Sequence, residues 1–185
     1  MRYSWALAYE VAAFIRMQLH PGCERIEIAG SLRRRKPDVG DIEILYIPIM
    51  QEEPDPADMF ATRNVVLADG RILGMEKAGI LARRKNSLGR EMYGPLNKLL
   101  VHVASGIPVD LFAATAENWF NYLVCRTGPA DSNTRICMAA QRLGWKWNPY
   151  GVGFTSAGGE VRRMDSERAV FAFVDLPYHE AEGRC

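Results

Sequence analysis

Residues 29–45 read AGSLRRRKPDVGDIEIL, and this stretch carries the strongest pattern in the chain. A Gly-Ser pair and a basic run lead into an apolar strand that contains Asp41 and Glu43. Side chains two positions apart on a strand point the same way, so the two carboxylates share one face while Ile42 and Ile44 occupy the other. Carboxylates held together repel each other, and a divalent cation is their usual partner. The pattern predicts an oxygen-ligand site for Mg²⁺ or Mn²⁺.

A third carboxylate, Asp110, lies in a second apolar strand, residues 107–113. Three carboxylates from two neighbouring strands are suited to hold two metal ions, which stabilise both oxygens of an in-line displacement. Gly30 and Ser31 add backbone N–H groups and a hydroxyl, and the basic run adds charge for a polyphosphate. Alone, Asp-x-Glu is common on solvated strands, and Gly-Ser before basic residues is usually a surface turn. Together in one window they indicate phosphoryl chemistry.

The composition fits a globular chain with a sizeable core: it has 185 residues, of which 48% are apolar, and a net charge of +1. No apolar run approaches the ~20 residues of a membrane helix, and the N-terminus lacks the apolar segment of a secretion signal. The cysteines lack the spacing of a zinc site or a disulfide framework. They are Cys23, Cys125, Cys137 and Cys185. We therefore expect a cytoplasmic, intracellular protein that does not bind membranes.

Periodicity and turn signals predict a mixed sheet with helices in the first part of the chain. An N-terminal helix should end near His20-Pro21-Gly22. Asp69-Gly70 is a hairpin signal between strands 65–67 and 71–73, and Ser105-Gly106 is a second one between strands 99–104 and 107–113. The other expected elements are strands 25–29 and 41–49, an acidic loop 51–58 and a short helix 76–82.

After residue 114 the pattern changes to short helices and short strands. Helices are expected over residues 115–123 and 130–143, and a last helix should run from a cap at Asp165 or Ser166 to Phe173. Short strands are expected at residues 145–148, 151–154 and 160–164. The change predicts a second structural unit that begins near residue 117.

Three motifs, GSLRR at 30–34, GDIE at 40–43 and VDLF at 109–112, resemble the nucleotidyltransferase palm of the family X DNA polymerases. The likeness continues through RTGPADSN at 126–133, GWKWNPYG at 144–151 and LPY at 176–178, in the order of the family. It covers nearly the whole chain. The resemblance implies an α+β fold with a palm over residues 1–116 and a small nucleotide- and DNA-binding subdomain over residues 117–185. This organisation is similar to that of the small viral enzymes of the family.

The resemblance also implies specific roles. Asp41, Glu43 and Asp110 would be catalytic and would hold two Mg²⁺ or Mn²⁺ ions, and Asp110 would also accept the proton of a primer 3′-hydroxyl. The residues implied to bind the incoming dNTP are Gly30, Ser31, Arg34 and Gly40 at its phosphates, and Thr127, Gly128 and Asn133 against its sugar and base. Arg126 would contact phosphate or template. Basic residues implied to contact DNA are Arg83, Arg84, Lys85, Arg135 and Lys146, although such charges are often only solvated. A near-neutral chain predicts modest, salt-sensitive DNA binding.

The sequence departs from the family pattern at three places. Glu43 stands where the family usually has Asp, so the added methylene could shift a metal ion. Cys125 and Arg126 precede Thr127-Gly128, where the family commonly has aromatic residues that help to exclude ribonucleotides. The chain also has no room for the amino-terminal lyase and helix-hairpin-helix modules of larger relatives, so no 5′-deoxyribose-phosphate lyase activity is expected.

The function expected from these observations is that of a minimal DNA polymerase in short gap-filling repair. Its partners would be dNTP and primer-template or gapped DNA, the chain is expected to be a monomer, and a virus- or phage-encoded origin is compatible with its size. A protein partner could add to the affinity for DNA, but no motif identifies such a partner. One alternative is a nucleotidyltransferase that acts on a tRNA end, an antibiotic or a protein. Another is a nucleic-acid-binding module whose catalytic site has decayed.

Overall fold

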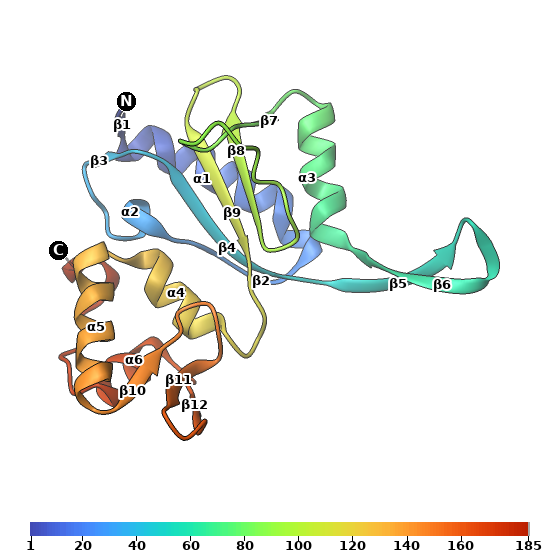
Figure 1. Cartoon of the computed structure of the whole chain (residues 1–185). Helices are drawn as coiled ribbons and strands as arrows, with labels where there is room; N and C mark the ends of the chain where they lie inside the picture. Colours follow the sequence, from blue (N-terminus) through green and yellow to red (C-terminus); the bar gives the residue numbers. More distant parts are fainter. Residues whose placement is uncertain (185) are drawn as a thin grey trace.

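The computed structural model describes residues 1–184 (Figure 1), and Cys185 lies outside the described residues. The helices are α1 (Trp5–Leu19), α2 (Gly30–Arg33), α3 (Leu67–Lys77), α4 (Trp119–Thr127), α5 (Ala130–Arg142) and α6 (Glu167–Phe173), with 3₁₀ turns η1 (His20–Gly22) and η2 (Ala181–Gly183). The strands are β1 (Tyr3–Ser4), β2 (Cys23–Ile28), β3 (Asp38–Val39), β4 (Ile42–Pro48), β5 (Met50–Asp55), β6 (Asp58–Val66), β7 (Leu81–Arg83), β8 (Asn97–His102), β9 (Pro108–Ala113), β10 (Trp145–Trp147), β11 (Gly153–Ser156) and β12 (Val161–Arg163). This is the mixed α+β architecture that the sequence predicts.

A five-stranded sheet in the order β2-β4-β9-β8-β7 forms the centre of the first part of the chain. The β4–β9 pair is parallel and the other pairs are antiparallel, so the sheet is mixed. The predicted hairpin around Ser105-Gly106 is confirmed as the β8–β9 pair. Because β4 and β9 run in the same direction side by side, their polar residues come together at one level of the sheet.

The two faces of the sheet bury different sets of residues. Ile42 and Ile44 of β4 are fully buried in the core that α1 and α3 cover. Leu45 and Ile47 point to the other face, where they pack with Trp119 of α4 in a second core. Helix α4 therefore covers the face of the sheet that carries the odd-numbered residues of β4. That is the face predicted for Asp41 and Glu43.

Helix α1 confirms the predicted N-terminal helix. The hydroxyl of Ser4 caps it by accepting a hydrogen bond from the backbone N–H of Leu7 at 3.4 Å. Its buried residues follow the helical period and pack on the sheet. They are Ala8, Val11, Ala12, Ile15 and Leu19.

The expected hairpin at Asp69-Gly70 is wrong, because these residues lie in the first turn of α3. Ala68, Ile72 and Met75 are buried at helical spacing, and this burial outweighs the turn preference of an Asp-Gly pair. Asp69 is also favourable at the positive end of the helix dipole. The short helix expected at 76–82 is likewise wrong, since α3 ends at Lys77 and the strand β7 follows.

The acidic loop expected at 51–58 is instead half of a two-stranded antiparallel arm, β5–β6, that projects from the body of the molecule (Figure 1). Most of the arm is exposed to solvent, including Met59 and Phe60 near its tip. Aspartates at its turn accept hydrogen bonds from backbone N–H groups two residues ahead, as Asp58 does from Phe60 at 3.0 Å. The sequence indicates a turn in this stretch, but it does not indicate that the residues on either side pair as strands.

The C-terminal region, residues 115–184, consists of α4, α5 and α6 with a three-stranded sheet, β10-β11-β12. Helix α4 begins at Trp119 and not at Thr115, because Thr115 and Asn118 exchange hydrogen bonds of 2.8 and 3.3 Å in a turn before it. The last helix is capped by Ser166, whose hydroxyl accepts from the backbone N–H of Ala169. The division of the chain near residue 117 stays a prediction. Within residues 1–184, no helix has the length and apolar character needed to cross a membrane.

Candidate active site

The carboxylates predicted from the sequence lie on the sheet face that α4 covers. Glu43 on β4 is the register neighbour of Asp110 on β9, in the parallel pair of strands. Asp41 immediately precedes β4 and is close enough to influence the charge of both other carboxylates. The side chains of Glu43 and Asp110 are only 19% and 14% exposed. Two adjacent strands therefore bring three acidic groups together.

Burial makes Glu43 and Asp110 hard to ionise. Desolvation, followed by the charge of Asp41, raises the pKa of Glu43 to about 7, although Arg126 acts against the shift. Desolvation also raises the pKa of Asp110, and the nearby Arg84 only partly offsets it. A carboxylate that loses water on burial has a raised pKa unless nearby positive charge and hydrogen bonds offset that loss. Such groups are candidates for functional sites.

Arginine side chains supply positive charge to these carboxylates: Arg34 acts on Glu43 through its charge, and Arg84 and Arg126 make direct contacts. Arg84 donates a short hydrogen bond to Oδ1 of Asp110 and a second hydrogen bond, of 3.1 Å, to the carbonyl oxygen of Leu100. Arg126 of α4 places Nη1 at 3.6 Å from Oε1 of Glu43. Arg84 comes from the edge of the sheet and Arg126 from the C-terminal region.

The residues fit a divalent ion in their chemistry. Within residues 1–184, no three His, Cys, Asp or Glu side chains are gathered closely enough to hold a metal ion as they stand. The donor set of Asp41, Glu43 and Asp110 is nevertheless all oxygen, as hard divalent ions prefer. Burial raises the pKa of Glu43 and of Asp110, so a divalent ion bound there would favour their ionised forms. The two-ion site therefore stays a prediction with a chemical basis.

Gly30 must be glycine for the α2 turn to approach the strand. Its φ is +64°, and a Cβ atom there would lie 2.5 Å from Oε2 of Glu43. The backbone is fixed by a hydrogen bond of 2.8 Å from the N–H of Ala29 to the carbonyl oxygen of Glu43. A Cβ atom at Gly40 would meet nothing within 4 Å, so sterics alone do not require glycine there.

Ser31 and Arg34 lie together at a shallow basic pocket of about 320 Å³. Lys36 and Arg2 add further positive charge to its lining. The sequence predicted Ser31 and Arg34 as phosphate-binding residues. The pocket has the positive charge and the hydrogen-bond donors that a phosphate group needs.

The segment from Thr127 to Asn133 contacts Arg34, at the C-terminal end of α2. Arg34 donates a short hydrogen bond to the carbonyl oxygen of Thr127, and Gly128 adopts a φ of +61° beside the Arg34 guanidinium. The Asn133 side chain donates a 2.9 Å hydrogen bond to the carbonyl oxygen of Cys125, next to Arg126. The structure thus brings Arg34 against Thr127 and Gly128 and places Asn133 next to Arg126, while nucleotide binding by these residues stays a prediction.

The residues predicted to contact DNA do not form one cluster. Arg83 is paired with Glu76 at 2.9 Å and lies 3.8 Å from the ring centroid of Tyr93. Lys85 is exposed near the same sheet edge, whereas Arg135 and Lys146 are exposed on the C-terminal region. Arg84 lies apart from this group because it points at Asp110. DNA contact by these residues stays a prediction.

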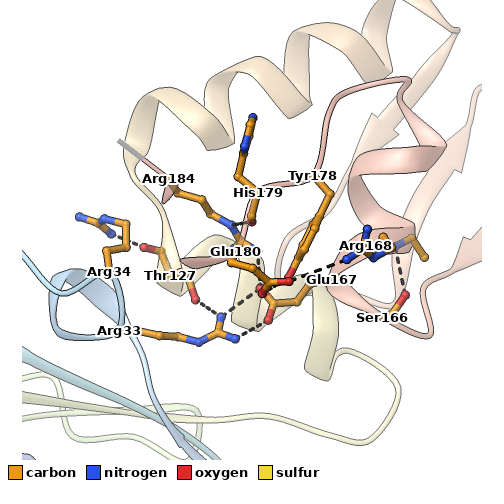
Figure 2. Close-up of polar contacts among 11 residues, drawn as sticks. Arg33, Arg34, Thr127, Ser166, Glu167, Arg168, Tyr178, His179, Glu180 and Arg184 are labelled. Carbon is orange, nitrogen blue, oxygen red and sulfur yellow. Dashed lines mark hydrogen bonds and ion pairs between the residues drawn. The ribbon is translucent and has the colours of Figure 1, made fainter. Parts of the chain in front are cut away.

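Sequence reasoning missed an ion-pair network centred on Glu167 (Figure 2). Arg33 donates hydrogen bonds of 3.0 and 2.5 Å to the two oxygens of Glu167 and one of 2.7 Å to the hydroxyl of Thr127. Arg184 adds an ion pair of 2.8 Å to the same carboxylate. The network joins α2 to the start of α6 and the end of the chain. Nothing local in the sequence marks it, because 134 positions separate Arg33 from Glu167.

Comparisons with known proteins agree with this fold. Residues 122–185 match the family model described as DNA polymerase beta thumb. No curated protein sequence matches the chain significantly. Two similar solved structures are Leishmania infantum polymerase beta in a ternary P/T complex and in a ternary gap complex.

The first of these is 18% identical with a TM-score of 0.73, and the match covers 100% of this chain and 77% of that one. The second is 17% identical with a TM-score of 0.73, and the match covers 100% of this chain and 71% of that one. At this level of identity the likeness shows the fold, while the thumb model adds a sequence match over the C-terminal residues. The chain therefore has the fold of polymerase beta, and its residues 122–185 match the polymerase beta thumb.

Proposed function

We propose that the protein is a minimal, metal-dependent DNA polymerase that transfers a nucleotide from dNTP to a primer 3′-hydroxyl and fills short gaps in DNA repair. The observation that carries this proposal is the register of Glu43 with Asp110 across the parallel β4–β9 pair. Asp41 immediately precedes β4, and the carboxylates lie on the sheet face against which α4 packs. Gly30, the neighbour of Ser31, approaches Glu43 closely. The polymerase beta fold supports DNA as the acceptor.

Asp41, Glu43 and Asp110 would hold two Mg²⁺ or Mn²⁺ ions. Such ions neutralise charge on the attacking and leaving oxygens of an in-line displacement. Asp110 would also accept the proton of the primer hydroxyl. Arg84 is a positioning residue for Asp110 in this account, because its hydrogen bonds hold one carboxylate oxygen against the sheet edge.

The nucleotide would lie between α2 and the C-terminal region. Its phosphates would contact Ser31, Arg34 and the backbone of Gly30 and Gly40. The sugar and base would lie against residues 127–133. The arrangement supports this placement because Arg34 contacts Thr127 directly, so the two parts of the predicted nucleotide site are adjacent.

Primer-template or gapped DNA would be bound by a single copy of the chain. Arg83, Lys85, Arg135 and Lys146 are exposed cations that could contact backbone phosphates. A net charge of +1 gives little long-range attraction to DNA. We therefore expect weak binding that falls steeply as salt is added.

The test is primer extension on a duplex with a one-nucleotide gap, with Mg²⁺ or Mn²⁺. Templated incorporation should fall by about 10³-fold in Asp110→Asn, the usual scale for removing one essential electrostatic group. The matched control is Asp58→Asn, which changes an exposed aspartate on the β5–β6 arm and should leave incorporation unchanged.

The other outcomes separate the alternatives. Incorporation that is as fast in Asp110→Asn as in the wild type would contradict the proposal. Transfer to a tRNA end, an antibiotic or a protein, without transfer to DNA, would identify a nucleotidyltransferase with another acceptor. Binding of nucleotide or DNA with no transfer under either metal would identify a decayed module.

A further inference from the structure

Arg126 lies at a place where a positive charge is needed, and it comes from outside the sheet. Its Nη1 is 3.6 Å from Oε1 of Glu43, and its Cζ atom lies 3.6 Å from the ring centroid of Phe112. The rings of Tyr122 and Tyr150 lie farther away, at 5.4 and 5.5 Å. The guanidinium is therefore supported by aromatic rings while it faces the carboxylate.

The geometry of this pair is that of a loose contact. The separation of 3.6 Å from Glu43 is within ion-pair range but exceeds the length of a hydrogen bond. The Nε atom of Arg126 is buried without a hydrogen-bond partner among the described residues. By contrast, Glu167 accepts hydrogen bonds of 3.0 and 2.5 Å from Arg33. Arg126 supplies charge to Glu43 without locking the carboxylate in place.

We propose that Arg126 is a placeholder cation, which balances Glu43 in the free protein and competes with a divalent ion for that carboxylate. Arg126 is then a positioning residue that lowers the metal affinity of the free protein. This inference rests on the proposed function, because it needs Asp41, Glu43 and Asp110 to be the metal ligands. It goes beyond that function by naming the group that an arriving ion displaces.

The contact with Phe112 explains how Arg126 can give up Glu43 to a divalent ion without losing all of its favourable contacts. Stacking on Phe112 is independent of Glu43, so the guanidinium keeps one favourable contact when an ion takes the carboxylate. Since Arg126 belongs to α4, ion binding also removes an electrostatic contact between β4 and the C-terminal region. The coupling is reciprocal: the factor by which a bound ion weakens the Arg126–Glu43 contact is also the factor by which that contact weakens ion binding. Removing the contact should therefore raise the affinity for the ion.

The test is titration of the protein with Mn²⁺ alone, without nucleotide or DNA, in which electron paramagnetic resonance measures the free ion. Arg126→Met keeps an apolar stem over Phe112 and removes the charge, so it should bind Mn²⁺ about tenfold more tightly than the wild type, within the usual range of such couplings. Arg126→Lys retains a charge and should stay close to the wild type. Circular dichroism of each variant checks that it is folded.

Arg168→Met is the matched control. Arg168 also lies over an aromatic ring, 4.5 Å from the centroid of Tyr178, and pairs with a carboxylate, Glu180, at 3.8 Å. It is on α6 and away from the predicted metal ligands, so its loss should leave the Mn²⁺ affinity unchanged. An equal gain in Arg168→Met would mean that net charge, and not the contact with Glu43, sets the affinity, and would overturn the inference.

A fourth variant, Asp41→Asn, distinguishes failure of the inference about Arg126 from failure of the proposed metal site. If Asp41→Asn abolishes Mn²⁺ binding while Arg126→Met binds no more tightly than the wild type, the placeholder inference is wrong and the proposed function stands. If neither the wild type nor Arg126→Met binds Mn²⁺, or if Asp41→Asn binds as well as the wild type, the metal site of the proposed function fails and the inference fails with it.

Discussion

Two glutamates with little solvent exposure, Glu167 and Glu43, face arginine side chains, and they differ in how well their charge is compensated. Glu167 is contacted by Arg33 and Arg184, and Figure 2 shows both guanidinium groups converging on its carboxylate. Burial alone would raise its pKa, but the hydrogen bonds and charges of these arginines lower it below the ordinary value. Burial and Asp41 raise the pKa of Glu43 to about 7 in spite of Arg126.

The difference separates a structural ion-pair network from a site that can accept a ligand. A carboxylate whose hydrogen bonds and charge are fully matched stabilises the fold and has little to gain from a further cation. Glu43 is largely desolvated beside two other carboxylates, and its pKa stays raised in spite of Arg126 and Arg34, so its ionised form costs stability until a cation arrives. The same residue types therefore support opposite roles at the two places.

The largest effect is expected from breaking the Glu167 network. Arg33→Gln removes three hydrogen bonds and leaves Glu167 with Arg184 alone, so we expect the free energy of unfolding to fall by about 3 kcal/mol. Urea denaturation measures this loss. Arg35→Gln is the neighbouring control, because Arg35 is 72% exposed and its pair with Glu182 should contribute little. Similar stabilities for the two variants would show that the network is not structural.

A smaller effect on the free energy of unfolding is expected when the pH is raised. Because the pKa of Glu43 in the folded protein, about 7, lies above its ordinary value of 4.5, the folded state binds the proton more tightly than the unfolded chain. Stability should therefore fall as pH rises through this window. Between pH 5 and pH 8 the wild type should lose about 2 kcal/mol relative to Glu43→Gln, which does not titrate. Urea midpoints of both proteins at the two pH values measure the difference, and parallel pH profiles would contradict it.

The smallest effect is expected at the turn beside Glu43. Gly30→Ala combines an unfavourable φ with a Cβ atom that would press on Oε2 of Glu43, so it should lower stability by about 1 kcal/mol. Gly40→Ala is the control, because a Cβ atom there meets nothing within 4 Å. Thermal unfolding compares them. A Gly30→Ala protein as stable as the control would mean that the turn has room to move away from the strand.

The parts of the fold that the sequence predicts well are those set by neighbouring residues. Alternation of Ile42 and Ile44 with Glu43 places the carboxylate face correctly, and Ser166 marks the start of α6. The likeness to known motifs places Asp110 in the site before the register with Glu43 is known. Short-range rules suffice here because strand periodicity and helix capping are local.

The parts that sequence reasoning missed depend on distant contacts. Asp69-Gly70 reads as a hairpin until the burial of Ile72 and Met75 against the core favours a helix. The strand pairing of the β5–β6 arm is not apparent in a stretch rich in acidic residues and proline. The guanidinium of Arg126 over Phe112 joins two segments that only the fold brings together. Such contacts carry no periodic or spacing signal.

The central claim is that the charge of Glu167 is matched and that of Glu43 is not. The most direct measurement is the free energy of unfolding of Glu167→Gln and Glu43→Gln at pH 8 in metal-free buffer, each against the wild type. We predict that Glu167→Gln loses about 3 kcal/mol, because two arginines are left without their carboxylate, while Glu43→Gln is as stable as the wild type or more stable. A loss in Glu43→Gln as large as that in Glu167→Gln would contradict the account.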